Sequence, residues 1–356
     1  MRLGIIGYAN NSGLGVMTQD LIRIFKIENH LIIPGGEKGT NLELSTALNK
    51  IASTSWLPPE SLLRDFLLTI DIIITIETTY HPGLFQICRE MGVRSVFLSM
   101  WEWFEWSKYK DADVYIATSI MCCDYLLSTL NVESKDVIND HIDKIKYLPW
   151  ALDTAKFEYK ERCGNRDITT FVHNAGFGGM NYRKGSIEVI EAFKRFDGCK
   201  IRLLLRTQKP IEQYPFYDYV KSDKRIHVFS GELESNKELY DEGDIFLYLA
   251  RYDGQALVVE EAMACGFPVF VTDARPMNEF SDDHRFMIRV SEYRKLKIHN
   301  HFIDMNITDV DDLVNRMKWS TYEELHDVSL DNRNCICDNY SWDMLKSRYT
   351  TLIYGQ

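Results

Sequence analysis

Two carboxylates stand in one short loop-and-helix segment, Tyr252–Pro268, whose sequence is YDGQALVVEEAMACGFP. Asp253 lies in a Gly-containing loop, and Glu261 follows eight residues later in an apolar stretch that predicts a helix. Because an α-helix turns once in about 3.6 residues, a ligand lying across the helix start could contact both carboxylates. Backbone N–H groups at a helix start lack partners within the helix, so they suit a phosphate. The alternative is an ordinary crossover helix of an α/β domain without any ligand.

The same segment resembles the donor-site signature of retaining GT-B glycosyltransferases, of the family-4-like kind also called glycosyl transferases group 1. That family reads E-G-F-G, four residues, then E-A-M-A-x-G-x-P-V, and Glu261–Val269 matches the second half closely. In the first half Asp253 stands at the family's Glu, and Gln255-Ala256 replaces Phe-Gly, while the spacing of the two acids is kept. Because an aspartate is one methylene shorter, we expect altered sugar selectivity rather than a different fold.

The resemblance implies the roles of three catalytic residues. Asp253 would contact the transferred sugar, Glu261 would bind the ribose hydroxyls, and Lys184 would neutralise the diphosphate. Relatives carry an Arg five residues before the Lys, but Gly179 stands there in this chain, so Arg183 or Arg206 would replace it. The alternative for these basic residues is a solvated loop. The resemblance also implies further donor-binding residues: Gly13, Gly15, Gly231, Gly254, Gln255, Ala256, Leu257 and Glu279. For Glu279, the cap of a short helix is the alternative.

Two other motifs have the spacing of a ligand-binding loop and of a metal site. Asn11–Gly15 follows the first predicted strand and supplies glycines that let a backbone approach a ligand, although it is not a full G-x-G-x-x-G. By resemblance it would face the donor phosphates and the acceptor, and a tight turn without a ligand is the alternative. Asp111-Ala112-Asp113 has the D-x-D spacing of GT-A metal sites. We reject it as a metal site because it precedes a predicted strand in a chain that resembles GT-B enzymes, and we expect no metal.

The acceptor side is less well defined by the sequence. His81 and the pair Trp101-Glu102 follow predicted strand ends, where α/β proteins bind ligands. Relatives often place a His at the second position, so the matching catalytic residue of this chain stays open. The nearby aromatic cluster could stack on sugar or base rings, or pack at the edge of the core; it consists of Trp101, Trp103, Phe104 and Trp106.

Composition is that of a soluble globular protein: 45% of the residues are hydrophobic and 26% are charged. The net charge of −11 argues against a general affinity for nucleic acid or anionic membranes. The eight cysteines show no zinc-finger spacing, which favours reduced thiols in a cytoplasmic protein. The chain opens as a strand without a signal-peptide layout, and no apolar run approaches the ~20 residues of a membrane span.

Short apolar runs alternate with helical patterns twice along the chain, which predicts two parallel sheets with crossover helices. Taken with the resemblance, this implies a GT-B fold, with two Rossmann-like domains facing each other across a cleft. By resemblance, residues 1–150 would form the acceptor domain and residues 165–335 the donor domain, and the helix at 341–356 would pack back on the first. Tyr147–Asn165 is the expected hinge. The predicted strands are Leu3–Tyr8, His30–Pro34, Ile70–Ile76, Ser95–Met100, Val114–Thr118, Thr170–His173, Lys200–Leu205, Ile226–Phe229, Ile245–Leu249 and Pro268–Thr272.

By resemblance, the protein moves a sugar from a nucleotide-diphosphate sugar, most plausibly a UDP- or GDP-sugar, to a glycan, lipid-linked or small-molecule acceptor, with retention and without a cofactor. Three alternatives stay open. A sugar-nucleotide epimerase shares the fold but needs more acid/base residues. A degenerate binding protein would explain the altered donor motif. A DNA-base glucosylating enzyme conflicts with the acidic charge, although nucleic acid is not excluded.

Overall fold

The computed structural model describes residues 1–130, 140–162, 167–176, 180, 182–231, 233, 236–298 and 301–355. The chain forms two compact units, one comprising Met1–Pro149 with Lys346–Gln356 and the other comprising Trp150–Leu345. Among the described residues, no helix is long and apolar enough to cross a membrane. Part of the expected hinge, residues 163–165, and the position of Gly179 lie outside the described residues.

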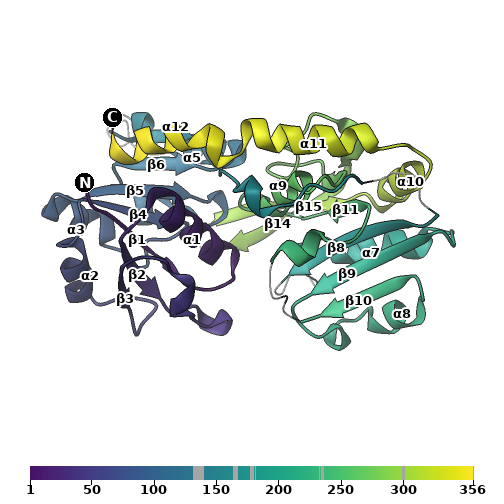
Figure 1. Ribbon diagram of the computed structural model, residues 1–356, viewed down its shortest axis with the longest axis horizontal. Coiled ribbons are helices and arrows are strands. Elements are labelled where there is room, and N and C mark those ends of the chain that lie inside the picture. Colours follow the sequence, from purple (N-terminus) through teal and green to yellow (C-terminus); the bar gives the residue numbers. More distant parts are fainter. Residues whose placement is uncertain are drawn as a thin grey trace. The chain divides into compact units, whose positions relative to one another are not determined.

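The first unit contains, in its described part, a seven-stranded sheet in the order β3-β2-β1-β4-β5-β6-β7 (Figure 1). Its strands are β1 (Leu3–Tyr8), β2 (Asn29–Ile33), β3 (Asn49–Ala52), β4 (Ile72–Ile76), β5 (Arg94–Ser99), β6 (Val114–Ala117) and β7 (Ile145–Tyr147). Its helices are α1 (Gly13–Phe25), α2 (Glu60–Leu67), α3 (Leu84–Met91), α4 (Trp106–Tyr109) and α5 (Ile120–Leu130). Every strand pairing described in this sheet is parallel, as the alternating apolar runs predict.

The second unit contains, within the described ranges, a six-stranded parallel sheet in the order β10-β9-β8-β11-β12-β13 (Figure 1). Its strands are β8 (Thr169–Gly176), β9 (Ile201–Thr207), β10 (Ile226–Ser230), β11 (Ile245–Tyr248), β12 (Val269–Thr272) and β13 (Met287–Ile288). Its helices are α7 (Ser186–Arg195), α8 (Tyr217–Ser222), α9 (Leu257–Ala264), α10 (Val310–Ser320) and α11 (His326–Asn339). An antiparallel hairpin, β14 (Val290–Ile298) and β15 (His301–Thr308), stands apart from that sheet.

Alternate residues of the second sheet enter two separate cores, because successive side chains of a strand point to opposite faces. Phe171 and Leu247 pack on one face with apolar residues of α7, α8 and α10. Val172 and Phe246 pack on the other face with apolar residues of α9 and α11. Helices therefore cover both faces, which is the doubly wound arrangement that places ligands at the carboxyl ends of the strands.

The last helix, α12 (Trp342–Tyr354), begins in the second unit and ends in the first. At its end the guanidinium of Arg94 donates to the carbonyls of Leu352 and Ile353 at 3.2 and 3.1 Å. The hydroxyl of Tyr349, fully buried, donates to the carbonyl of Pro149 at 2.9 Å. Buried polar contacts therefore fix the end of this helix within the first unit.

The predicted strands are confirmed, with boundaries that differ by at most three residues. The sequence pattern missed β3, β7, β13 and the hairpin. β3 reads Asn-Lys-Ile-Ala and is mostly exposed, so it lacks the apolar run of a buried strand. Within the expected hinge, Arg162 is buried. Its guanidinium donates to the carbonyls of Tyr240, Gly243 and Cys265.

Candidate active site

The strand order of the second sheet reverses between β8 and β11, and two of the three catalytic candidates, Lys184 and Asp253, meet at this point. In doubly wound sheets, ligands bind outside the carboxyl ends of the two strands that flank such a reversal. Lys184 lies in the segment after β8, and Asp253 lies in the loop after β11. Tyr248 is the last residue of β11. The topology therefore brings together side chains that are 69 residues apart in the sequence.

Lys184, Tyr248 and Asp253 form a triangle of short hydrogen bonds. Lys184 Nζ donates to the Tyr248 hydroxyl and to Asp253 Oδ2, both at 2.6 Å. The Tyr248 hydroxyl also donates to Asp253 Oδ2 at 2.6 Å. A second cation joins them, since an Arg183 guanidinium nitrogen lies 3.2 Å from the same oxygen. Two cations therefore converge on one carboxylate at the end of β11.

The Asp253 carboxylate stays ionised despite its burial. The residue is 8% exposed, and burial alone would raise its pKa. The charges of Arg183 and Lys184, with hydrogen bonds from Lys184 and Tyr248, outweigh that effect and hold the pKa well below its usual range. The site is therefore a charged network in which two cations contact one carboxylate.

The position after Lys184 requires a glycine, Gly185, for a steric reason. Its φ is +67°, and a Cβ placed there would lie 2.0 Å from the carbonyl oxygen of Leu249. The two loops touch at this point, and the N–H of Arg251 donates to the carbonyl of Arg183 at 2.8 Å. Only a residue without a side chain allows this contact, so the Lys-Gly pair fixes Lys184 against the end of β11.

The buried Arg251 joins the loop after β11 to two further elements, α7 and β15. Its guanidinium donates twice to Glu188 Oε1 of α7. Its carbonyl accepts two hydrogen bonds from Asn306 of β15, from the backbone N–H at 2.8 Å and from Nδ2 at 3.0 Å. Contacts from a helix and a hairpin thus hold the backbone that carries Asp253.

The predicted phosphate-binding loop, Gly254–Leu257, is capped by its own aspartate. Asp253 Oδ1 accepts the N–H groups of Gln255 at 3.3 Å and of Ala256 at 3.0 Å. Ala256 precedes the first residue of α9 and has φ +65° and ψ +38°, the left-handed region that an alanine rarely adopts. The family carries Gly at this position, and the backbone conformation explains that preference. The alanine of this chain therefore introduces strain beside the site.

We expect Ala256→Gly to leave the free energy of unfolding within about 1 kcal/mol of the original value. The relief of a left-handed alanine, about 1–2 kcal/mol, offsets the lost buried methyl of about 0.8 kcal/mol and the entropy of glycine. The matched control is Ala262→Gly, since Ala262 is equally buried but helical in α9. That change should cost about 1–2 kcal/mol. Equal losses in denaturant unfolding would contradict the strain.

Glu261 lies in α9 and is 5% exposed. Its Oε2 accepts the hydroxyl of Tyr240 at 2.5 Å, and Tyr240 is itself buried. Burial, followed by the charge of Glu261, raises the pKa of Tyr240 well above its usual value, so the tyrosine remains a donor. Sequence reasoning missed Tyr240, which orients one of the predicted catalytic carboxylates.

The other donor-side candidates are spread along the same edge of the sheet. Arg206 near the end of β9 donates to the carbonyl of Glu238 at 2.6 Å, and burial lowers its pKa. Gly231 follows β10 with φ +136°. Glu279 is partly buried in turns, not at a helix cap, and its carbonyl accepts the Tyr340 hydroxyl at 3.3 Å. None of these three residues has a contact to Lys184 or Asp253 among the hydrogen bonds described.

The first unit carries the predicted donor-binding residues Gly13 and Gly15 after β1, and the predicted acceptor-side residues after β4 and β5. Gly13 begins α1, and Gly15 is required because a Cβ there would lie 2.1 Å from the carbonyl oxygen of Asn10. His81, partly exposed, accepts the N–H of Gly83 at its Nδ1. Trp101 and Glu102 are 3% and 2% exposed, so burial leaves His81 as the more accessible candidate.

The aromatic cluster next to β5 is largely core. Phe104 and Trp106 are 1% and 5% exposed, and their rings pack edge to face at 4.8 Å. Trp103, 37% exposed, is the member that reaches the surface. Core packing therefore accounts for most of this cluster.

The Asp-Ala-Asp motif holds structural contacts. Asp113 accepts the N–H and the hydroxyl of Ser95 at 2.8 and 2.9 Å, and Asp111 pairs with Arg89 at 2.9 Å. Among the residues that the structure describes, no group of three or more His, Cys, Asp or Glu side chains could hold a metal ion.

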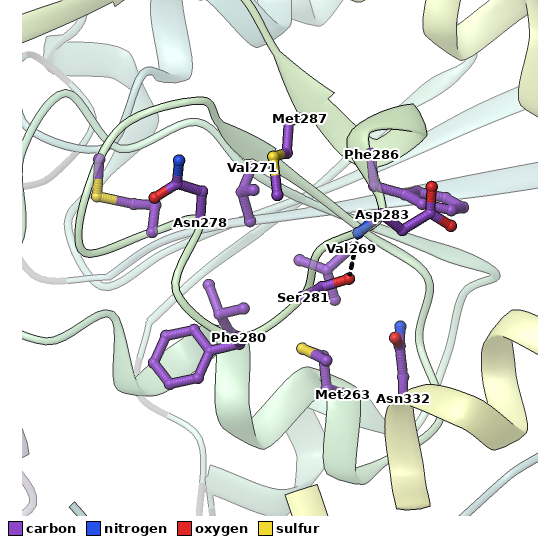
Figure 2. A pocket seen from close by; sticks show the side chains of 12 residues that line it. Met263, Val269, Val271, Asn278, Phe280, Ser281, Asp283, Phe286, Met287 and Asn332 are labelled. Atoms are coloured by element: carbon purple, nitrogen blue, oxygen red, sulfur yellow. Dashed lines mark hydrogen bonds between the residues drawn. The ribbon is translucent and has the colours of Figure 1, made fainter. Parts of the chain in front are cut away.

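A separate small pocket, of about 20 Å³, lies between α9, β12, β13, the turns at 277–283 and α11 (Figure 2). Met263, Phe280, Phe286 and Met287 give it a mainly apolar lining. At its rim Ser281 Oγ accepts the N–H of Asp283 at 3.1 Å (Figure 2). None of the predicted site residues lines this pocket, so it is distinct from the charged network.

Comparison with known proteins agrees with this geometry. Residues 175–296, about a third of the chain, match the family model described as glycosyl transferases group 1. That range includes Lys184, Asp253 and Glu261. Among curated proteins, none matches the sequence.

Solved structures resemble the whole chain at low identity. HepE from Anabaena, in complex with UDP and glucose, is 11% identical over 100% of both chains with a TM-score of 0.72. The apo lipopolysaccharide outer core galactosyltransferase WaaB is 14% identical over 100% of this chain and 99% of its own, with a TM-score of 0.68. Sucrose-phosphate synthase from Thermosynechococcus elongatus is 12% identical over 100% of both, at 0.70. The chain thus has the GT-B fold, and its second unit carries the match to glycosyl transferases group 1.

Proposed function

We propose that this protein is a glycosyltransferase that moves a sugar from a nucleotide-diphosphate sugar to an acceptor. The observation that carries the proposal is the charged network at the strand-order reversal, where Lys184 and Arg183 converge on Asp253. The match of residues 175–296 to glycosyl transferases group 1 supports it, because that range contains the network. Solved structures of similar fold hold UDP with glucose or UDP-glucose, which favours a UDP-sugar over a GDP-sugar.

The proposed role of each residue follows from the negative charge that develops on the departing diphosphate. Breaking the bond between sugar and diphosphate leaves negative charge on the departing phosphate, so a fixed cation there stabilises the transition state more than the ground state. Lys184 would supply that cation, with Arg183 beside it. Asp253 would bind the hydroxyls of the sugar, and Glu261 would bind the ribose. Because the cations are protein groups, we propose a reaction without a metal or cofactor. The resemblance to retaining GT-B enzymes leads us to propose retention of anomeric configuration.

The acceptor is open, and a glycan, lipid-linked or small molecule all remain candidates. The described cysteines are free thiols, which agrees with the reducing cytoplasm as the proposed location. Among the rival functions, the degenerate binding protein is favoured by specific observations. The backbone N–H groups of Gln255 and Ala256, which would bind a phosphate, donate to the Asp253 carboxylate. Ala256 has a strained, left-handed backbone conformation.

A panel of nucleotide sugars tests the proposal. We expect the cognate donor at a hundredfold over its Kd to add about 2.7 kcal/mol to the free energy of unfolding, seen as a thermal shift. The same donor should release free nucleotide diphosphate in a transfer or hydrolysis assay. A shift without release would indicate the binding protein, and neither signal with any UDP- or GDP-sugar would contradict the proposal.

A further inference from the structure

A buried carboxyl group lies next to the site and has no part in the reaction proposed above. Glu260 is 0% exposed in α9, between Val259 and Glu261. Its Oε1 accepts a hydrogen bond from Nε2 of Gln255 at 3.2 Å, and Gln255 is 4% exposed. An acid and an amide therefore meet in the interior of the loop that carries Asp253.

Each member of this contact leaves one polar atom without a partner. Oε2 of Glu260 and Oε1 of Gln255 are both buried and have no hydrogen bond among the described residues. A buried orphan atom costs about 1–3 kcal/mol, so two in a single contact require an explanation. Both atoms are acceptors if Glu260 is ionised. If Glu260 carries a proton on Oε2, that atom becomes a donor, and the Gln255 oxygen is the acceptor that it lacks.

We propose that Glu260 and Gln255 form a neutral acid–amide pair, joined by two hydrogen bonds, that positions the loop around Asp253. In one bond Gln255 Nε2 donates to Glu260 Oε1. In the other the proton on Glu260 Oε2 is donated to Gln255 Oε1. The pairing does not depend on the proposed function, whereas its effect on donor binding does.

The electrostatic surroundings keep the proton on Glu260. Burial is the largest influence and raises the pKa of Glu260 well above its usual value. The charged groups that act on it are carboxylates, Glu261 on the same helix and Glu279 in the turns at 273–280, and both raise the pKa further. The hydrogen bond from Gln255 acts in the opposite direction and is outweighed.

The pair reaches Asp253 through the backbone. The N–H groups of Gln255 and Ala256 donate to Asp253 Oδ1, so a shift of the Gln255 side chain moves the cap of the aspartate. Glu260 and Gln255 thus act as positioning residues, which hold the loop whose backbone caps Asp253.

Equilibrium unfolding of the full chain as a function of pH, for the original protein and Glu260→Gln, tests the pair. The amide of the variant can form the same two bonds without a titrating proton. Unfolding frees Glu260 to ionise near pH 4.3, so above this pH the original protein loses stability until the folded group also ionises. The ratio of the two unfolding constants should therefore change about tenfold per pH unit between pH 5 and 7, in favour of Glu260→Gln. Glu191→Gln, on the exposed face of α7, is the matched control and should show no such trend.

A ratio that stays constant with pH would overturn the proposal. If Glu260→Gln does not fold, carbon-13 NMR of the original protein with labelled glutamate carboxyls decides. One carboxyl that stays protonated at pH 7 supports the pair, and its absence overturns it. In a double-mutant cycle, Glu260→Leu should destabilise more than Gln255→Leu with Glu260→Leu, because the single change leaves the Gln255 amide unpaired. Nucleotide-sugar affinity is measured in parallel, and its absence in the original protein would reject the proposed function while leaving these results intact.

Discussion

Lys184→Met should lower kcat for sugar transfer by about 10²- to 10³-fold, the range for removing one positioned donor from a developing anion. The side chain is 18% exposed and is held at 2.6 Å from both Tyr248 and Asp253, so the cation is oriented before a ligand binds. Methionine keeps most of the apolar stem and removes the ammonium group, which lies 4.7 Å from the centre of the Tyr248 ring. The measurement is steady-state kinetics with the donor identified in the panel.

The control for this change is Lys194→Met, which removes a lysine from the exposed surface of α7 in the same unit. Its kcat should stay within twofold of the original value. Thermal unfolding of both variants separates lost catalysis from lost structure, because Asp253 retains Arg183 and Tyr248 as partners in Lys184→Met. If Lys184→Met keeps kcat within twofold, the diphosphate contact lies elsewhere, and Arg183 is the next residue to change.

Local patterns in the sequence are sufficient to predict the central strands of the two parallel sheets. Strands such as Leu3–Tyr8 are continuous apolar runs because both faces of their sheet are covered, and the loops between them carry Gly and polar residues. The same patterns do not predict the hairpin β14–β15. Its first strand, Val290–Ile298, is mostly exposed and rich in charged residues, so it shows no apolar run.

The candidate site is predictable only where a motif carries it. Lys184 and Asp253 stand in segments that resemble a known family, but their contact depends on the strand order, which joins residues 69 positions apart. Tyr248 was missed because a tyrosine at the end of a strand resembles a core residue. Its position beside the strand-order reversal would have singled it out.

The pair formed by Gln255 and Glu260 could not be derived from the sequence. The sequence predicts that Gln255 binds the donor, and the structure shows in addition that its amide contacts a buried acid. A glutamate in an apolar helix is visible in the sequence, but its partner lies in a loop whose conformation depends on the left-handed Ala256. Such backbone geometry follows from tertiary contacts rather than from local propensity.

Asp253→Asn is expected to cost about 3 kcal/mol of the free energy of unfolding, because removing one member of a buried ion pair leaves the others uncompensated. Lys184 and Arg183 lose their common counter-ion, and the new amide nitrogen would oppose their N–H groups. The exposed ion pair of Asp241 with Lys160 provides the control, since Asp241→Asn should cost at most about 1 kcal/mol. Equal losses in denaturant unfolding would contradict the network.

The stability that Asp253 contributes should depend on pH in a definite direction. The pKa of Asp253 is held below its usual range in the folded protein, so its contribution to stability is present above the unfolded value of about 3.9. That contribution disappears as the pH falls through the folded pKa. The difference in stability between the original protein and Asp253→Asn should therefore be constant from pH 6 to 8 and shrink below about pH 4.

Asp253→Glu keeps the negative charge but lengthens the side chain by one methylene, so most of the stability should be kept. The change should alter kcat/KM among donor sugars more than it alters the Kd for the bare nucleotide diphosphate, which lacks the sugar. Equal losses in both would place Asp253 outside the sugar pocket and leave it as the cap of the loop before α9.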